Sequence, residues 1–361
     1  MTGFEELKKK NFLHTIPLQT RETDGGIILP DKDRLGGVVD SRFNFVPESA
    51  FRYGDLTLWG GAYDIDEAVE EIAETVIFIG HMQRHWGNFL FDCMTRIWYA
   101  LREPAPYRLA YCGIQTEENA LGNPNTRYGE FMRLLGMEAD RFIDIRKPTG
   151  FSKVIIPELS AFPGTFYTEE FAMTFDRVIA NVNRLTSYES YDKIYLTRRQ
   201  MAACKELGEK EIETIFRELG YQVIAPEKLE VAEQVYLFSH CKSFASIEGT
   251  TSHNILFAQD GTEHIILRKQ DYTNTRQLVF DRLKHIAPEY IDVYYEPFRG
   301  FPLSHDMGPF YIGVTSSLYK WVKERAYSFS MSDKVTILYS KIRNFFVYTL
   351  KCIYYKYWLY R

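Results

Sequence analysis

The segment from Lys193 to Leu267 most constrains the fold, because short apolar runs alternate in it with helical patterns. Runs rich in β-branched or aromatic residues are the expected strands, and they occupy residues 193–196 (KIYL), 221–225 (YQVIA) and 243–247 (SFASI). The stretches between them, residues 206–219 and 231–241, are expected helices, and Gly220 ends the first. Strands that alternate with helices in this way predict an α/β fold with an open sheet.

Polar residues follow two of these strands. Arg198 and Arg199 come directly after the first strand, and residues 248–254 (EGTTSHN) follow the third and open a further expected helix. Ligands of open α/β sheets bind at this carboxyl edge. A glycine- and hydroxyl-rich turn before a helix offers an anion free N–H groups and the positive end of the helix dipole. Each signal alone also fits a surface salt bridge or a helix cap, but their coincidence on one edge favours an anion site.

These residues resemble the C-terminal half of glycosyltransferase family 61, which contains bacterial capsular and exopolysaccharide transferases and eukaryotic protein and xylan glycosyltransferases. The family pattern is a strand ending in an Arg pair, an acidic helix, a strand followed by PE-x-L, and a Gly-containing turn before N-x-x-F. The matching sequences here are YLTRR, ELGEKEIETIF, GYQVIAPEKL, EQVYLF and EGTTSHNILF. An upstream block, GHMQRHWGNFLFDCMTRIWYAL at Gly80–Leu101, is similar to a second family segment.

The chain departs from the family pattern at two places. Glu248-Gly249-Thr250 stands where many members have His-Gly-Ala, which leaves the identity of the donor open. The run from Lys205 to Glu209 stands where many have Arg-Arg-Ile-x-Asn-Glu. Lys205 keeps a positive charge there but loses the bidentate geometry of arginine.

The resemblance implies a donor site built on the second half of the chain. Arg198, Arg199 and Lys205 are expected to offset the diphosphate charge, and Glu248 to accept hydrogen bonds from ribose or sugar hydroxyls. The full expected donor set is Arg198, Arg199, Lys205, Glu227, Glu248, Gly249, Thr250, Thr251, Ser252, His253 and Asn254. Asn254 is equally consistent with a helix-turn contact. The donor is expected to be a nucleotide sugar, a UDP-sugar before others, and no further cofactor is implied.

A second chemical cluster comprises His81, His85, Asp92 and Arg96. If the strand TVIFIG ends near Gly80 and a helix runs from Asn88 to Leu101, Asn88, Asp92 and Arg96 share one helical face. Inverting sugar transfer needs a base for the acceptor hydroxyl, and our hypothesis is that His85 or Asp92 serves. The alternative is an Asp92–Arg96 ion pair, with His85 packed beside Trp86.

Two motifs with metal-binding spacing favour other interpretations. The run from His81 to His85 has the histidine spacing of a zinc peptidase but lacks the Glu that would be its general base. Asp64-Ile65-Asp66 has the DxD form, yet the helical-looking DEAVEEI that follows favours an N-cap and a first-turn acid. The resemblance also implies a metal-independent enzyme, so no metal is expected.

Composition limits the class of protein. With 361 residues, 45% of them hydrophobic and 25% charged, the chain is long enough for two cores, and two domains are expected. A net charge of −5 gives no basic field for nucleic acid. The five scattered cysteines have no zinc-ribbon spacing, and the N-terminus has no continuous apolar run. We therefore expect a reduced, cytoplasmic protein that is not exported.

A break near residues 186–190 (TSYES) separates the expected domains. Residues 1–187 are the expected acceptor-side α/β domain, with helices at 127–136 and 169–186, and residues 188–310 the expected nucleotide-sugar domain. Residues 311–361 form a helical tail. The resemblance implies the GT-B architecture, in which two Rossmann-like α/β domains face a cleft.

The tail from Lys334 to Arg361 contains six Lys or Arg, no acid and nine aromatic residues. Its apolar residues recur near helical spacing, while lysines interrupt them too often for a membrane span. This pattern favours an amphipathic helix in the membrane interface, and the alternative is a helix packed back on the N-terminal domain.

Together these observations predict an inverting glycosyltransferase that acts on a capsular, exopolysaccharide or other surface glycan, peripheral at the inner face of the cell membrane. A nucleotide-dependent alditol-phosphate transferase and a non-catalytic glycan- or nucleotide-binding scaffold remain as alternatives. The linkage, the acceptor and the oligomeric state, a homo-oligomer included, stay open.

Overall fold

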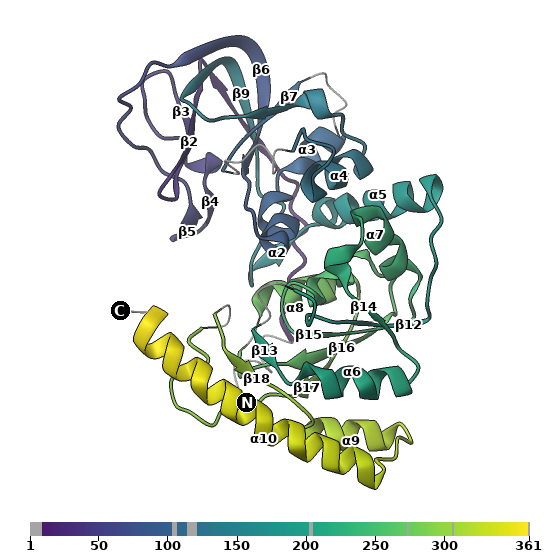
Figure 1. Cartoon of the computed structure of the whole chain (residues 1–361). Helices are drawn as coiled ribbons and strands as arrows, with labels where there is room; N and C mark the ends of the chain where they lie inside the picture. Colours follow the sequence, from purple (N-terminus) through teal and green to yellow (C-terminus); the bar gives the residue numbers. More distant parts are fainter. Residues whose placement is uncertain are drawn as a thin grey trace. The chain divides into compact units, whose positions relative to one another are not determined.

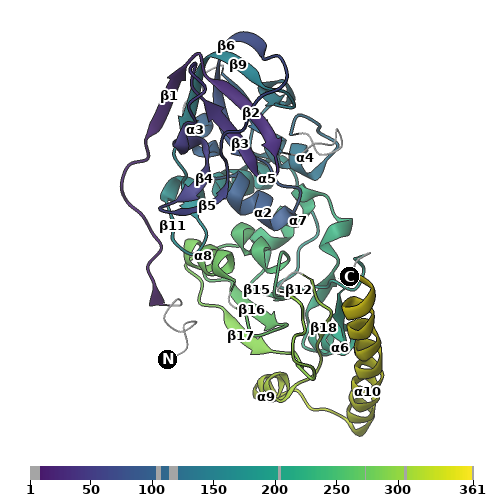
Figure 2. The ribbon, with the colours of Figure 1, turned by 90° about the vertical axis from the view of Figure 1, so that its left-hand side faces the viewer.

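A computed structural model describes residues 9–102, 107–113, 121–201, 205–272, 274–304 and 307–359 (Figures 1 and 2). The chain divides into two compact units, Met1–Ser187 and Tyr188–Arg361. Each unit has its own sheet and its own buried core, and residues 311–361 belong to the second unit.

The first unit contains a mixed sheet in the order β3-β2-β9-β6-β7-β8, with β1 paired to β9. Its strands are β1 (Thr20–Asp24), β2 (Ile27–Lys32), β3 (Leu35–Val39), β6 (Glu70–His81), β7 (Arg108–Cys112), β8 (Phe142–Asp144) and β9 (Thr149–Pro157). The strands β9, β6, β7 and β8 run parallel, whereas β1 and β2 join β9 antiparallel. Buried Phe78, Ala110 and Val154 form the core of this sheet. Only part of this sheet is therefore Rossmann-like.

The helices of the first unit lie beside the sheet (Figure 1). They are α2 (Trp86–Asn88), the π-helical η2 (Phe89–Cys93), α3 (Ile97–Arg102), α4 (Arg127–Leu134) and α5 (Glu169–Leu185), with short 3₁₀ turns η1 (Pro47–Ser49) and η4 (Ala139–Arg141). Two small hairpins pair β4 (Phe51–Tyr53) with β5 (Leu56–Trp59) and β10 (Ala161–Phe162) with β11 (Phe166–Tyr167). The helices expected at 127–136 and 169–186 are confirmed, each within a few residues.

Two expectations for the first unit are wrong. The acidic run DEAVEEI is not a helix, because β6 begins at Glu70 and pairs with β9 from the register Glu70↔Thr149 onward. The helix expected from Asn88 to Leu101 is broken between η2 and α3. The carbonyl of Thr95 accepts from both the N–H and the hydroxyl of Ser160, and this contact replaces helical hydrogen bonding at the break.

The second unit contains a parallel sheet in the order β14-β12-β15-β16-β17. Its strands are β12 (Lys193–Leu196), β14 (Gln222–Ile224), β15 (Ser243–Ile247), β16 (Glu263–Arg268) and β17 (Glu289–Asp292). In chain order this is the doubly wound 2-1-3-4-5 arrangement, whose switch point lies between its first and third strands, here β12 and β15. The three strands predicted from the sequence are confirmed.

Helices cover both faces of this sheet (Figures 1 and 2). One face packs on α6 (Glu209–Glu218) and α9 (Ser316–Glu324) through a core that includes Tyr195 and Phe216. The other face is covered by α7 (Val231–His240) and α8 (Thr275–Leu283). Strands buried on both faces explain the nearly continuous apolar runs in the sequence.

Two expectations for the second unit are corrected. The helix expected at 206–219 begins only at Glu209, because Glu206–Leu207 form the strand β13, which pairs with β18 (Phe310–Tyr311). The turn after β15 opens not an α-helix but a short 3₁₀ segment, η6 (Ser252–Phe257). Another 3₁₀ turn, η5 (Pro226–Lys228), follows β14.

The C-terminal part of the second unit is α10 (Met331–Tyr354), followed by the π-helical η7 (Tyr355–Leu359). A capping box between Ser330 and Asp333 begins the helix. Tyr348 stacks on Phe298 and Tyr311, so α10 packs against its own unit and lies beside β18 in both views (Figures 1 and 2). Among the described residues, no helix has the length and apolarity needed to cross a membrane.

Candidate functional site

The carboxyl edge of the second unit's sheet brings together residues that follow three different strands. Arg198 follows β12, Glu248 and Gly249 follow β15, and Lys269 follows β16. A Cβ atom built on Gly249 would lie 3.8 Å from Nζ of Lys269 and 3.9 Å from Nη1 of Arg198. Two cations therefore flank this glycine at the switch point, where doubly wound proteins bind their ligands.

Both cations contact one buried carboxylate. Oε1 of Glu206 lies 3.0 Å from Nε of Arg198 and 3.0 Å from Nζ of Lys269. Burial alone would raise the pKa of Glu206, but Lys269 and Arg198 hold it below its ordinary value. Burial lowers the pKa of Lys269, and Glu206 opposes that shift. With Glu206 ionised and both bases protonated, the trio carries one net positive charge.

Glu248 is a second buried carboxyl group at this edge. Burial raises its pKa to about 7, although Arg268 and Lys269 act in the opposite direction. Its Oε2 has no hydrogen-bond partner among the described residues. The Glu248 carboxyl group can therefore exchange a proton near neutral pH and still has an oxygen available for a ligand.

A third carboxylate, Glu209, supports the turn after β12. It accepts a hydrogen bond from the Tyr195 hydroxyl at 2.9 Å and one from the Arg198 N–H at 3.1 Å. Burial raises the pKa of Glu209 to about 7, although the two hydrogen bonds act to lower it. These contacts hold the backbone of Arg198 in place, so Glu209 positions a cation that it does not itself neutralise.

The structure separates the predicted Arg pair. Arg198 turns toward Glu206, whereas Nη1 of Arg199 lies 2.6 Å from Oε2 of Glu213 on α6. Thr197 also donates to Glu213. Of the two guanidinium groups, that of Arg198 is the one beside Gly249.

The hydroxyls of the predicted anion-binding turn, residues 248–254, form hydrogen bonds within the turn itself. Thr251 donates to the Ile247 carbonyl at 3.0 Å, and Ser252 donates to the Gly249 carbonyl at 2.7 Å. The N–H of Gly249 donates back to Ser252. These hydroxyls therefore hold the turn together and do not cap η6, while Gly249 and Thr250 are half-buried.

The other predicted donor residues lie close by along the chain. His253 and Asn254 are buried in η6, where Nε2 of His253 lies 3.1 Å from Nδ2 of Asn274. Glu227 is exposed on η5, and the carbonyl of Lys205 accepts from the N–H of Phe310 in β18. The sequence reasoning missed Lys269 and the role of Glu206. A lysine directly after the strand EHIILR was the available signal for Lys269.

In the first unit, the predicted catalytic residues occupy different environments. Asp92 is buried in η2 and accepts from Nε2 of Gln83 at 3.0 Å, while Gln83 in turn accepts from Asn88 at 2.6 Å. His85 is exposed at the start of α2. Asp92 is therefore tied into a side-chain network, and His85 faces solvent.

Arg96 is a structural residue of the first unit. It is 2% exposed, and its guanidinium donates to the carbonyls of Pro157, Glu48 and Ala50. Burial lowers its pKa to about 9. These contacts point Arg96 into the core. The prediction that Arg96 shares one continuous helical face with Asn88 and Asp92 is therefore wrong.

His81 ends β6 and lies against a different acid. Its Nε2 is 3.7 Å from Oδ1 of Asp31, and its ring stacks on Trp59 with centroids 4.8 Å apart. Burial lowers the pKa of His81, while Asp31 opposes the shift. Burial therefore favours the neutral imidazole.

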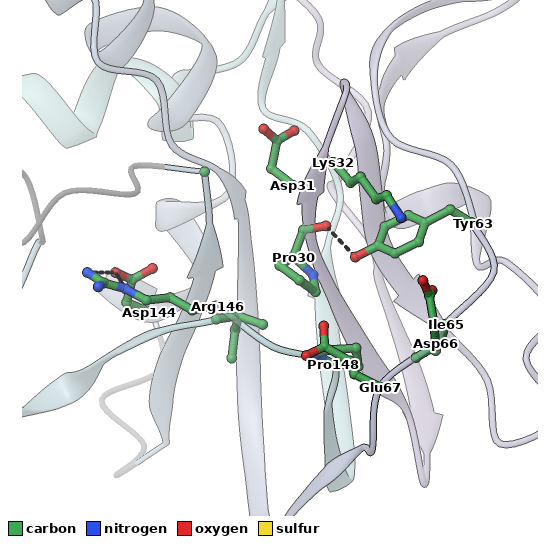
Figure 3. Close-up of a pocket in the computed structure, with 12 residues that line it drawn as sticks. Pro30, Asp31, Lys32, Tyr63, Ile65, Asp66, Glu67, Asp144, Arg146 and Pro148 are labelled. Atoms are coloured by element: carbon green, nitrogen blue, oxygen red, sulfur yellow. Dashed lines mark hydrogen bonds and ion pairs between the residues drawn. The ribbon is translucent and has the colours of Figure 1, made fainter.

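A pocket of about 610 Å³ opens in the first unit around the ends of β2, β7 and β8 (Figure 3). Tyr63 donates to the Pro30 carbonyl at 3.1 Å, and Nζ of Lys32 lies 5.2 Å from the centre of the Tyr63 ring. Asp144 contacts Arg146 at 2.8 Å on the other side of the pocket. An aromatic ring beside several carboxylates suits a hydroxylated ligand, because carboxylates accept hydrogen bonds from hydroxyls.

Asp66 of the DxD motif also lines this pocket. In the part of the chain that the structure describes, no three His, Cys, Asp or Glu side chains are grouped so as to hold a metal ion.

Comparison with known proteins assigns the chain to a family. Residues 86–265 match the family model described as Glycosyltransferase 61. This range contains Asp92, Arg198 and Glu248, and it begins one residue after His85. No curated protein matches the chain. Residues 86–265 thus form a glycosyltransferase domain, and through it the chain is a member of glycosyltransferase family 61.

Proposed function

We propose that the chain transfers a sugar, with inversion, from a nucleotide-sugar donor to a surface-polysaccharide acceptor. The observation that carries the proposal is the pair of cations, Arg198 and Lys269, on either side of Gly249 at the switch point. A diphosphate is the part of the donor that needs such a pair, because its charge increases as the sugar leaves. A UDP-sugar is the donor to test first.

The cations are proposed to take the place of a divalent metal ion. Both are already ordered by Glu206, so little side-chain freedom is lost when the diphosphate binds. Glu248 is proposed to contact ribose or sugar hydroxyls through the oxygen that has no partner among the described residues. The absence of a Cβ on Gly249 allows the donor to approach the backbone closely.

The acceptor is proposed to bind to the first unit, as in a GT-B enzyme. His85 or Asp92 is proposed as the base that removes the proton of the acceptor hydroxyl. Asp92 is favoured by its place inside the matched family segment, and the hydrogen bond from Gln83 holds its carboxylate in one orientation. Alanine at both positions with unchanged turnover would refute this part of the proposal.

A donor panel tests the proposed function. The purified protein is incubated with individual nucleotide sugars, and free nucleotide is measured with and without EDTA. We expect release from at least one donor, unchanged by EDTA and strongly reduced in Arg198→Ala and Lys269→Met. The matched control is Lys242→Met, because Lys242 precedes β15 at the opposite edge and pairs with Asp192 on the surface. Release that survives both site substitutions would contradict the proposed donor site.

A further inference from the structure

The helix α10 has one face that packs on the second unit and an opposite face whose apolar side chains are at least half exposed. Its buried residues are Ser340, Asn344, Tyr348 and Cys352, spaced four apart. Its opposite face carries large apolar residues at steps of three or four, which are Val335 (60% exposed), Tyr339 (66%), Ile342 (51%), Phe346 (63%), Leu350 (67%) and Ile353 (50%). We call these six residues the outward stripe.

The exposed face of α10 is more apolar than the exposed face of an ordinary surface helix. A surface helix normally turns its charged side chains outward and its apolar stripe toward the core. Here the core-facing positions include Ser340 and Asn344, while the outward positions are apolar. Contiguous exposed apolar surface of this kind marks a binding surface.

The charges on α10 indicate what binds there. Lys334, Lys341 and Arg343 are exposed on α10, each about 100° around the helix from a residue of the outward stripe that adjoins it in sequence. The one acid of the helix, Asp333, is engaged in the capping box. Apart from Asp333, the charged residues of α10 are therefore all basic.

A second copy of the chain fits this surface poorly. Paired helices place the residues that flank an apolar stripe across from one another, where opposite charges stabilise the pair. Two copies of α10 would instead bring lysines and arginines together without acidic partners. A surface of anionic phospholipid complements both the apolar stripe and the basic charge of α10.

A groove adjoins the outward stripe. It has a volume of about 740 Å³ and lies between α10 and the segment 294–297. Ile342 and Phe346 belong to both the groove and the stripe, and Nζ of Lys341 lies 4.5 Å from the centre of the Tyr295 ring in its wall. The apolar surface is therefore continuous from the stripe into a space with the character of a hydrocarbon-chain site.

We propose that α10 lies flat on a membrane surface containing anionic phospholipid, with the outward stripe in the interface and the adjoining groove receiving an acyl chain. This inference does not depend on the donor site, because it uses only α10 and the residues packed against it.

Vesicle co-sedimentation tests the proposal with the full chain. The vesicles contain either phosphatidylcholine alone or phosphatidylcholine with phosphatidylglycerol. We expect binding to the anionic vesicles that weakens with salt, and much weaker binding to the neutral ones. Phe346→Glu should weaken binding by roughly tenfold or more, because the ring no longer enters the interface.

The matched control is Met173→Glu, which introduces the same charge at an apolar residue of α5 that is 62% exposed, against 63% for Phe346. This control should bind as the unaltered chain does, and both variants should melt at the unaltered temperature. Donor hydrolysis without vesicles should also be unchanged in Phe346→Glu, so a failure here is distinguishable from a failure of the donor site.

Two results would overturn the proposal. One is binding by Phe346→Glu equal to that of the unaltered chain. The other is a vesicle-independent dimer that Phe346→Glu dissociates, which would assign the outward stripe to a second copy.

Discussion

Lys269 forms a buried ion pair with Glu206, with 3.0 Å between Nζ and Oε1. The two residues lie 63 positions apart in the chain. Both side chains are almost fully buried, at 8% and 0% exposure. Because Arg198 contacts the same oxygen, a single carboxylate fixes the position of both cations at the proposed donor site.

Glu206→Gln should strongly destabilise the second unit. The substitution leaves Lys269 and Arg198 without their shared counter-charge in a buried place, which costs about 3 kcal/mol of unfolding free energy. Urea unfolding measures the loss. Pyrophosphate should restore part of the stability, since it supplies negative charge to the same two cations. The absence of any pyrophosphate effect on this variant would argue against a diphosphate site there.

Gly249→Ala should impair donor binding beyond its effect on stability. Gly249 has a φ of +135°, and a Cβ there would enter the space between Lys269 and Arg198. The control is Gly261→Ala, because Gly261 also has a positive φ of +82° but nothing within 4 Å of a built Cβ. Both variants should lose about 1–2 kcal/mol of stability. Only Gly249→Ala should raise the KM for the donor. An equal rise in both variants would mean that Gly249 serves the turn and does not contact the donor.

Glu248→Gln should make the protein more stable at alkaline pH. Burial raises the pKa of Glu248 from 4.5 to about 7, so the folded state keeps a proton that the unfolded chain releases. The unfolding free energy therefore falls between about pH 4.5 and about pH 7 and then levels off. Glutamine removes this penalty, so the variant should gain about 2 kcal/mol near pH 8 and little near pH 5.

Thermal melting across this pH range measures the difference. Glu227→Gln is the control, because Glu227 is exposed on η5 and its substitution should leave the pH dependence of melting unchanged. A Glu248→Gln curve parallel to that of the unaltered chain would contradict the raised pKa.

Arg96→Lys should destabilise the first unit although it keeps the charge. A lysine cannot reach the carbonyls of Pro157, Glu48 and Ala50 together, which leaves buried acceptors unsatisfied at a cost of about 3 kcal/mol. Arg108→Lys is the control, since Arg108 makes a partly exposed pair with Glu74. An Arg96→Lys variant that unfolds at the same urea concentration as the unaltered chain would contradict this structural role.

The strands β12, β14 and β15 and the helix α7 could be predicted because their patterns are local. Glu206 could not be placed, since its strand β13 forms only by pairing with β18, about a hundred residues later in the chain. The inward turn of Arg96 depends on carbonyls from distant segments in the same way. The sequence predicted that Arg198 and Arg199 both lie at the sheet edge. Which guanidinium reaches Gly249 depends on the surrounding acids Glu206 and Glu213, which the local pattern does not place.

The short pairing of β13 with β18 affects how this chain can be engineered. Tyr311 of β18 donates its hydroxyl to the Lys341 carbonyl of α10, and the ring of Phe310 lies 4.0 Å from Nζ of Lys269. Deleting α10 would thus uncover the strand that supports Glu206. The helix α10 therefore cannot be exchanged for another helix without disturbing the packing around Lys269, and point substitutions on its exposed face are the safer way to test the proposed membrane attachment.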